Sequence, residues 1–121
     1  MTNVLPSGWH TVTPRIVVAD PAGLIAFLER VFDASAEVRT GAPSLIRMGD
    51  SLLMVSGAES REAFPAFLYV YVADADATFQ RALDAGAVSL EAVWDTPYGD
   101  RRGMVRDRWG NVWQVATRPA R

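Results

Sequence analysis

The sequence predicts an α+β fold in which two βαβββ units form a cup-shaped mixed sheet and the chain pairs as a dimer. The order strand, helix, strand, strand, strand occurs twice along the 121 residues. Short segments of the first half also recur in the second half. A four-stranded sheet with one helix on one face leaves its other face open, and two such units can close their open faces around a cavity.

The first unit is expected over residues 13–56. It opens with a strand over 15–19, which is rich in β-branched residues. Asp20-Pro21 then starts a helix, because an aspartate caps the first turn and a proline fits the first helical position. Apolar residues recur at helical spacing over 24–32. The remaining strands of this unit are expected at 36–39, 44–48 and 52–55.

A polar segment over 57–65 is expected to link the two units, and the second unit is expected over 66–117. It opens with a strand over 66–72, which alternates tyrosines with aliphatic residues. Asp74 or Asp76 is expected to cap the helix that follows. The remaining strands of this unit are expected at 88–94, 102–106 and 111–117.

Internal matches support a duplication. Val18-Ala19-Asp20 recurs as Val72-Ala73-Asp74, and residues 32–36 resemble residues 83–87. In both halves the matched segments stand at the same place in the order of elements. We therefore expect the whole chain to form one domain over residues 1–121, built from the two related units.

The side chains that the chain lacks exclude several chemistries. It has no cysteine, its 12 residues of the lysine and arginine class are all arginine, and its one histidine is His10. Thiolate nucleophiles, disulfides, cysteine-bound zinc and lysine Schiff bases are therefore excluded. A site with two histidine ligands cannot form within one chain. Carboxylate, arginine, tyrosine, hydroxyl and amide chemistry remains, as does binding without a reaction.

Charge and hydropathy argue against a nucleic acid or a membrane as partner. The net charge is −2, whereas a nucleic-acid interface needs a basic face. Asp100 and Asp107 stand among the arginines of 101–108, which favours an ion-paired surface. No apolar run reaches the ~18 residues of a membrane span, and residues 1–6 lack the pattern of a signal peptide. A cytoplasmic location is expected, in agreement with the absence of cysteine.

Two strand-to-helix junctions and the closing stretch of the chain carry a resemblance to a known family. The junctions are Val18-Ala19-Asp20 and Val72-Ala73-Asp74. The closing stretch reads Tyr98-Gly99-Asp100-Arg101-Arg102-Gly103 and then Asp107-Arg108-Trp109-Gly110-Asn111-Val112-Trp113. It is similar to the Trp-Gly-Asp-Arg-Tyr-Gly…Asp-Pro-X-Gly-Asn/His-X-Trp pattern of the vicinal oxygen chelate superfamily, in its glyoxalase/bleomycin-resistance branch. The resemblance covers about residues 13–117 and implies the duplicated fold.

Metal-dependent members of this superfamily hold a divalent ion with His, Gln or Glu side chains. The resemblance places the corresponding positions near Thr13, Met54, Leu68 and Gln114, and only Gln114 offers a usual ligand atom. Because a catalytic divalent ion needs about three protein ligands, we expect no metal and no other cofactor. The alternative is a divalent metal bound through a shifted register that includes His10.

The same positions predict which side chains line the cavity, because strand residues alternate between the two faces of a sheet. Trp113 and Val115 are expected to face a helix, and so are Tyr69 and Tyr71 unless the register of their strand slips by one residue. The expected cavity face contains Thr13, Arg15, Val17, Leu52, Met54, Leu68, Val70, Val72, Val112, Gln114 and Ala116.

Arg15 is interpreted either as a clamp for a ligand carboxylate, carbonyl or phosphate, or as one half of a structural ion pair. Trp94 and Tyr98 are expected to stack on a flat ligand, with a core or interface position as the alternative for Trp94. The methionines would form adaptable walls or fill gaps in the core. The complete set of expected ligand-binding residues is Arg15, Met54, Trp94, Tyr98, Arg102, Met104 and Gln114.

No catalytic residue is expected, because none of the acid–base candidates falls in mid-strand on the expected cavity face. Those candidates are Glu37, Glu91, Asp95, Tyr98 and Asp100. The sequence therefore predicts a metal-independent homodimer that binds a small molecule, such as an antibiotic or an aromatic metabolite. The alternative function is a divalent-metal lyase, isomerase or dioxygenase of the same superfamily. A third possibility is a structural dimer with a filled cavity.

Overall fold

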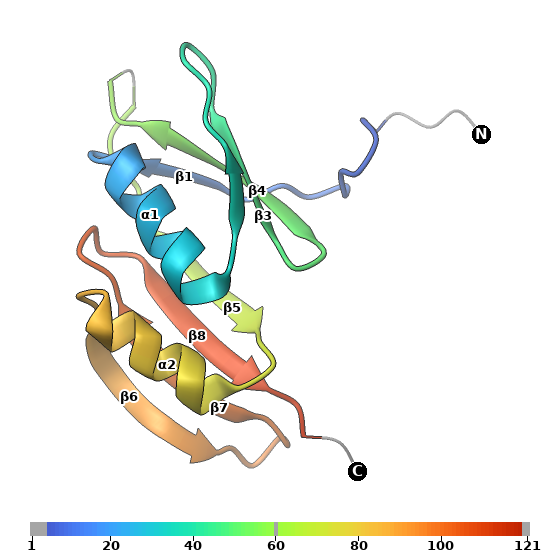
Figure 1. Cartoon of the computed structure of the whole chain (residues 1–121), viewed down its shortest axis with the longest axis vertical. Helices are drawn as coiled ribbons and strands as arrows, with labels where there is room; N and C mark the ends of the chain where they lie inside the picture. The colour runs from blue at the N-terminus through green and yellow to red at the C-terminus, as the bar shows by residue number, and fades with distance from the viewer. Residues whose placement is uncertain (1–4, 60, 120–121) are drawn as a thin grey trace. The chain divides into compact units, whose positions relative to one another are not determined.

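The computed structural model describes residues 5–59 and 61–119 and divides the chain into two compact units (Figure 1). The first unit comprises residues up to 29 together with 33–64, and the second comprises 30–32 together with the residues from 65 onward. Each unit contains one four-stranded sheet. Among the described residues, no helix is both long enough and apolar enough to cross a membrane.

The sheet of the first unit has the strand order β1-β4-β3-β2. β1 runs parallel to β4, and the other neighbouring strands are antiparallel. The elements in chain order are β1 (Arg15–Val18), α1 (Pro21–Phe32), β2 (Ser35–Glu37), β3 (Ser44–Met48) and β4 (Ser51–Gly57).

Helix α1 begins where the sequence predicts it. The Asp20 carboxylate accepts a hydrogen bond from the backbone N–H of Gly23 at 3.0 Å, and Pro21 occupies the first turn. The helix ends at Asp33, whose φ of 56° is left-handed. The segment predicted to be a linker also pairs with the sheet, because Phe64 forms an isolated antiparallel bridge with Val17.

The second unit repeats this topology with the strand order β5-β8-β7-β6, which confirms the prediction of two βαβββ units in an α+β fold. β5 runs parallel to β8, and α2 packs across β6, β7 and β8 (Figure 1). The elements are β5 (Phe67–Tyr71), α2 (Ala75–Asp84), β6 (Val88–Asp95), β7 (Arg101–Arg106) and β8 (Val112–Thr117).

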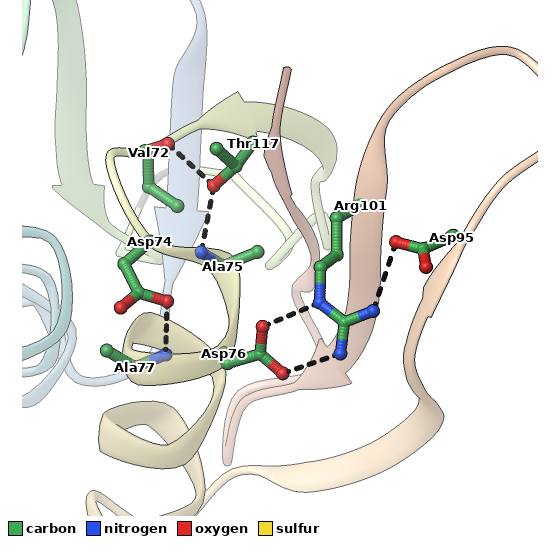
Figure 2. A network of polar contacts seen from close by, with 8 residues as sticks. All are labelled: Val72, Asp74, Ala75, Asp76, Ala77, Asp95, Arg101 and Thr117. Carbon is green, nitrogen blue, oxygen red and sulfur yellow. Dashed lines mark hydrogen bonds and ion pairs between the residues drawn. The ribbon is translucent and has the colours of Figure 1, made fainter. Parts of the chain in front are cut away.

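The start of α2 is tied to the end of β8 (Figure 2). The Asp74 carboxylate accepts from the backbone N–H of Ala77 at 3.1 Å, so Asp74 is the cap of the two candidates. The Thr117 hydroxyl accepts from the N–H of Ala75 at 2.8 Å and donates to the carbonyl of Val72 at 2.9 Å. These bonds satisfy backbone groups that a strand-to-helix junction would otherwise leave unpaired.

Arg101 joins the helix to the hairpin of β6 and β7. Its Nε and Nη2 donate to the two carboxylate oxygens of Asp76 at 2.7 and 3.0 Å, and its Nη1 donates to Asp95 at 3.1 Å (Figure 2). The predicted ion pairs form here, but Arg101 pairs with Asp76 on the helix and with Asp95 on β6 and not with the neighbouring Asp100 or Asp107. The neighbouring Asp100 and Asp107 are instead buried, at 2% and 4% exposure.

The loop between β7 and β8 is organised by the buried carboxylate of Asp107. It accepts hydrogen bonds from the backbone N–H groups of Trp109 and Asn111, from the Asn111 side-chain amide and from the Trp113 indole, all at 2.9 Å. Asn111 Oδ1 in turn accepts from the N–H of Ala66 at 2.9 Å. The stretch that carries the family resemblance therefore holds the start of β5 against the hairpin of β7 and β8.

The register of β5 corrects one prediction. Tyr69 and Tyr71 were expected to face the helix, but Tyr69 pairs with Gln114 and shares its open face. Leu68 and Val70 lie on the helix side, because they pair with the fully buried Trp113 and Val115. The hydroxyl groups of both tyrosines reach one buried carboxylate, that of Asp100, which accounts for the orientation of the strand.

Candidate functional site

Each sheet turns one face toward buried apolar side chains and leaves its other face open. On the open face of the second sheet, the pairing register places two neighbouring rows of side chains across the four strands. The first row is Tyr69, Gln114, Met104 and Glu91, and the second row is Tyr71, Ala116, Arg102 and Trp94. Four of the seven predicted ligand-binding residues therefore meet on this face, and Tyr98 joins them from the loop after β6.

Arg102 is the more buried of the two charged side chains in these rows, with 11% of its side chain exposed against 38% for Glu91. Its Nη2 donates to the carboxylate of Glu91, and its Nη1 donates to the Tyr98 hydroxyl at 3.2 Å. Its Nε is buried and has no hydrogen-bond partner within the described part of the chain. A buried donor without a partner costs about 1–3 kcal/mol, so Arg102 Nε is a buried side-chain donor that the described residues leave unsatisfied.

Glu91 holds Arg102 and Trp94 together. Its Oε1 also accepts a hydrogen bond from the Trp94 indole N–H, while 45% of Trp94 stays exposed. Glu91 was not expected in mid-strand on an open face, and this expectation is wrong. The register of β6 shifts on both sides of Glu91, so the simple alternation of faces does not hold along this strand.

Asp100 anchors the tyrosines of β5. Its Oδ2 accepts hydrogen bonds from the hydroxyl groups of Tyr69 at 2.6 Å and Tyr71 at 2.8 Å, and its Oδ1 accepts from Arg118 Nε at 2.5 Å. The hydrogen bond from Tyr69, followed by those from Tyr71 and Arg118, lowers the pKa of Asp100 below its ordinary value, despite the opposing effect of burial. Asp100 therefore stays ionised.

Tyr69 stays protonated. Burial raises the pKa of its hydroxyl well above the ordinary value, and the hydrogen bond to Asp100 raises it further. A hydroxyl has one proton, and that of Tyr69 points to Asp100. The Tyr98 oxygen lies 3.5 Å from the Tyr69 oxygen and accepts from Arg102, so Tyr98 can direct its own proton to a ligand.

Gln114 lies between Tyr69 and Met104 in the first row. Its side-chain amide makes no hydrogen bond to another described residue. An amide offers two donors and an acceptor in one plane. Gln114 therefore adds free polar groups to the same open face that carries Arg102 and Trp94.

Arg15 and Met54 lie on the open face of the first sheet, where they are direct partners across the parallel pair of β1 and β4. Arg15 is exposed, and its Nε donates to the Ser56 hydroxyl at 3.2 Å. Within the described residues no carboxylate pairs with it. The exposure of Arg15 removes the deep burial that motivated both interpretations, a ligand clamp and an ion pair with the other unit or a second chain.

The side chains present do not fit the divalent metal site that the resemblance implies. At the paired central strands they are Arg15 with Met54 and Tyr69 with Gln114. Of these, only Gln114 carries a usual ligand for a hard or borderline divalent ion. No group of three or more His, Cys, Asp or Glu side chains that could hold a metal occurs among the residues described. His10 is exposed and precedes β1.

Sequence reasoning missed three residues of this site: Tyr69, Glu91 and Asp100. Tyr69 was assigned to the wrong face, Glu91 was placed off the face, and Asp100 was interpreted as a surface charge. One signal was available for Asp100. It follows Gly99, whose φ of 98° marks a tight turn, and such turns can return a side chain toward the sheet.

A mixed four-stranded sheet with one helix, present twice, together with two open faces, defines the class of the protein as a duplicated βαβββ fold. Residues 9–115 match the family model described as the Glyoxalase/Bleomycin resistance protein/Dioxygenase superfamily. The chain belongs to this superfamily, which confirms the resemblance seen in the sequence.

The chain is similar to two mycobacterial proteins whose names call them uncharacterised. It is 31% identical to Mb0911c from Mycobacterium bovis, over 86% of this chain and 80% of that protein. It is also 31% identical to Rv0887c from Mycobacterium tuberculosis, over 86% of this chain and 72% of that protein.

Solved structures share the fold. TioX from Micromonospora sp. ML1 is 24% identical, with a TM-score of 0.77 over 91% of this chain and 99% of that one. A glyoxalase/bleomycin resistance protein/dioxygenase family enzyme from Burkholderia phytofirmans PsJN is 20% identical, with a TM-score of 0.75 over 87% and 95% of the two chains. At these identities the likeness concerns the fold alone.

Proposed function

We propose that this protein binds a flat small molecule on the open face of its second sheet and does so without a divalent metal. The observation that carries the proposal is the Nε of Arg102, a buried donor without a partner in the described residues, beside two exposed aromatic rings. A carbonyl or carboxylate oxygen of a ligand would satisfy this donor once a neighbouring side chain moves to expose it, because the Nε is buried.

Polar groups around Arg102 support a defined ligand orientation. Glu91 and Tyr98 hold the guanidinium from two sides, so its Nε–H has a fixed direction. Tyr98 adds a hydroxyl from the loop after β6, and Gln114 adds an amide from β8. Donors that are held in place before binding lose little conformational entropy when the ligand arrives, which favours affinity.

Aromatic side chains support a flat ligand. Trp94 is 45% exposed and Tyr98 is 51% exposed. The hydrogen bond from the Trp94 indole to Glu91 holds the ring while leaving much of it accessible. Stacking contributes about 0.5–1.5 kcal/mol per ring pair beyond the burial of area, and the thioether of Met104 adapts to the shape of its neighbour.

The proposal includes metal independence, a homodimer and a cytoplasmic location. The scarcity of metal-ligand atoms on the central strands supports metal independence. Exposed apolar side chains on β5 and before it, Phe67 at 67% and Phe64 at 76%, support association with a second copy. The absence of cysteine agrees with a reducing compartment.

The test titrates chelator-treated protein with fused-ring aromatic ketones and carboxylates, such as a naphthoquinone and a naphthoate. Tryptophan fluorescence and calorimetry report binding. The variants R102Q and Q114L should each weaken binding by about tenfold or more, the cost of a lost charge-assisted or well-placed hydrogen bond.

The matched control is R101Q, which removes the same charge one residue away but from the opposite face of β7. Binding by R101Q should stay within about twofold of wild type. Equal loss in R101Q and R102Q would contradict the proposal. Affinity that appears only after a divalent metal is restored would replace it with the metal-dependent alternative.

A further inference from the structure

We propose a second ligand site, in the first unit, that takes a single-ring aromatic carboxylate. A cavity of about 350 Å³ lies between the segment before β1 and the open face of β2, β3 and β4. Its volume falls within the range of small-molecule sites, about 300–1,000 Å³. The residues on which the argument depends are Ser7, Trp9, Glu37, Leu45, Arg47 and Leu52.

The pairing register builds the floor of this cavity. Arg47 pairs with Leu52 and Glu37 pairs with Leu45, so two neighbouring rows each place one charged and one apolar side chain on the same face. Leu52 is only 9% exposed although it lies on the open face of the sheet. Leu45 and Arg47 therefore stand on the central strand of this floor, with Glu37 on the strand to one side and Leu52 on the strand to the other.

The wall opposite is a tight turn of the chain. The backbone N–H of Trp9 donates to the carbonyl of Pro6 at 3.1 Å, and Gly8 has a left-handed φ of 84°. A side chain at Gly8 would meet Nη2 of Arg47 at 3.5 Å. The turn thus runs directly beside the Arg47 guanidinium and places the Trp9 indole in the lining of the cavity.

Charge identifies the ligand's polar group. Arg47 makes no ion pair with a carboxylate of the described residues, and the only ion-pair contact of Glu37 is with Arg39, at 4.0 Å. Arg39 directs its Nε to the carbonyl of Pro43 instead, at 2.9 Å. Among the described residues the Arg47 guanidinium is thus without a carboxylate partner in the lining of the cavity, and its fork of donors matches the geometry of a carboxylate.

The remaining lining identifies the rest of the ligand. Trp9, Leu45 and Leu52 provide apolar walls for one ring. Glu37 accepts a hydrogen bond and repels a second negative charge. The class is therefore an aromatic monocarboxylate with a hydroxyl or amino group away from the carboxylate, and a dicarboxylate of the same size should bind more weakly.

The test uses 4-hydroxybenzoate as the probe and terephthalate as the dianionic comparison. Calorimetry measures the dissociation constant, and ¹⁵N–¹H spectra follow the four tryptophan indole signals of the full-length protein. Binding should shift the Trp9 signal, and terephthalate should bind at least about tenfold more weakly than 4-hydroxybenzoate.

Two arginines of the first unit give a matched pair. The variant R47Q should weaken binding of 4-hydroxybenzoate by about tenfold or more, whereas R39Q, whose side chain lies outside the lining, should stay within about twofold. W9F and W9L test the stacking of the ligand on residue 9. W9F keeps an aromatic ring and should retain most of the affinity, whereas W9L removes the ring. Circular dichroism checks that each variant is folded.

The outcomes distinguish this site from the one on the second sheet. Wild-type affinity in R47Q, or no binding of the probe at millimolar concentration, would overturn the inference. Loss of binding in R102Q with no change in R47Q would also overturn it, and would support the proposed function instead. Loss of binding in R47Q with no change in R102Q supports the site in the first unit, whether or not the open face of the second sheet binds a ligand.

Discussion

Asp100 is the residue on which the geometry of the second open face most depends. Two tyrosine hydroxyl groups and one guanidinium converge on its carboxylate, which is 2% exposed. A buried carboxylate with three donors is held in its charged form, and each donor is in turn fixed by it. The position of Tyr69 beside Tyr98 and Gln114 is therefore a consequence of Asp100.

We expect D100N to lower the free energy of unfolding at neutral pH and to have a smaller effect in acid. The pKa of Asp100 is lowered by folding, so the unfolded state binds a proton at higher pH than the folded state. The stabilisation is fully present above the unfolded value of about 3.9 and is lost as the pH falls through the folded value.

Urea unfolding at about pH 7 and about pH 3 checks this expectation. The difference between wild type and D100N should shrink in acid. D50N, which changes an exposed carboxylate in a turn, serves as the control and should show a small difference at both pH values. A D100N effect that is unchanged in acid would contradict the assigned role of the charge.

At the scale of elements, the sequence predicted helix starts well and strand faces less well. Asp20 and Asp74 act within one helical turn, so the signal for each cap is local. β5 alternates aromatic with aliphatic residues, and both sets are apolar enough to be buried, so alternation cannot decide its inner face. The faces of β6 depend on irregularities in its pairing, which no short sequence pattern specifies.

The contact between α2 and β7 depends on a glycine. A Cβ at Gly103 would lie 2.7 Å from Cδ1 of Phe79 and 2.8 Å from Cγ2 of Val93. The absence of a side chain therefore lets the helix approach the sheet. We expect G103A to destabilise the protein by about 1–3 kcal/mol, the usual cost of overpacking a core.

Thermal and urea unfolding measure this cost. G57A is the matched control, because this strand glycine would meet only the flexible carboxylate end of Glu59. Its free energy of unfolding should change little. Equal destabilisation by the two substitutions would contradict the contact with α2 as the cause of the effect.

At the scale of the whole molecule, the duplication could be predicted because each unit repeats the same order of elements and the same capped junction. The candidate site was predicted in part. Arg102, Met104 and Gln114 do share one face, because β7 and β8 alternate regularly. Trp94 reaches the same face through the shifted register of β6. Arg15 and Met54 belong to the other sheet, and pairing between distant strands is not visible in any local pattern.

Metal removal should leave the protein unchanged. The central strands present a guanidinium, a thioether, a phenol and an amide, which together form a poor set of ligands for a divalent ion. We expect the melting temperature and ligand affinity to be the same before and after treatment with a chelator. A fall in either, reversed by one equivalent of a divalent metal, would refute metal independence.

Sedimentation should show a particle of twice the chain mass of 13.2 kDa. The reason is the exposed apolar surface of Phe64 and Phe67, since each apolar Å² removed from water stabilises association by about 25 cal/mol. Because this contribution is apolar, association should persist at high salt. A monomer at micromolar concentration would contradict the homodimer.

The loop around Asp107 has a consequence for how relatives of this protein are interpreted. Its carboxylate accepts four hydrogen bonds from the loop and from Trp113, and none of its partners lies on the open rows of the sheet. The most recognisable stretch of the sequence is therefore an architectural signature, and two proteins can share it while recognising unrelated molecules. Relatives are better sorted by the side chains at the positions of Arg102, Gln114 and Arg47 than by the stretch that identifies the superfamily.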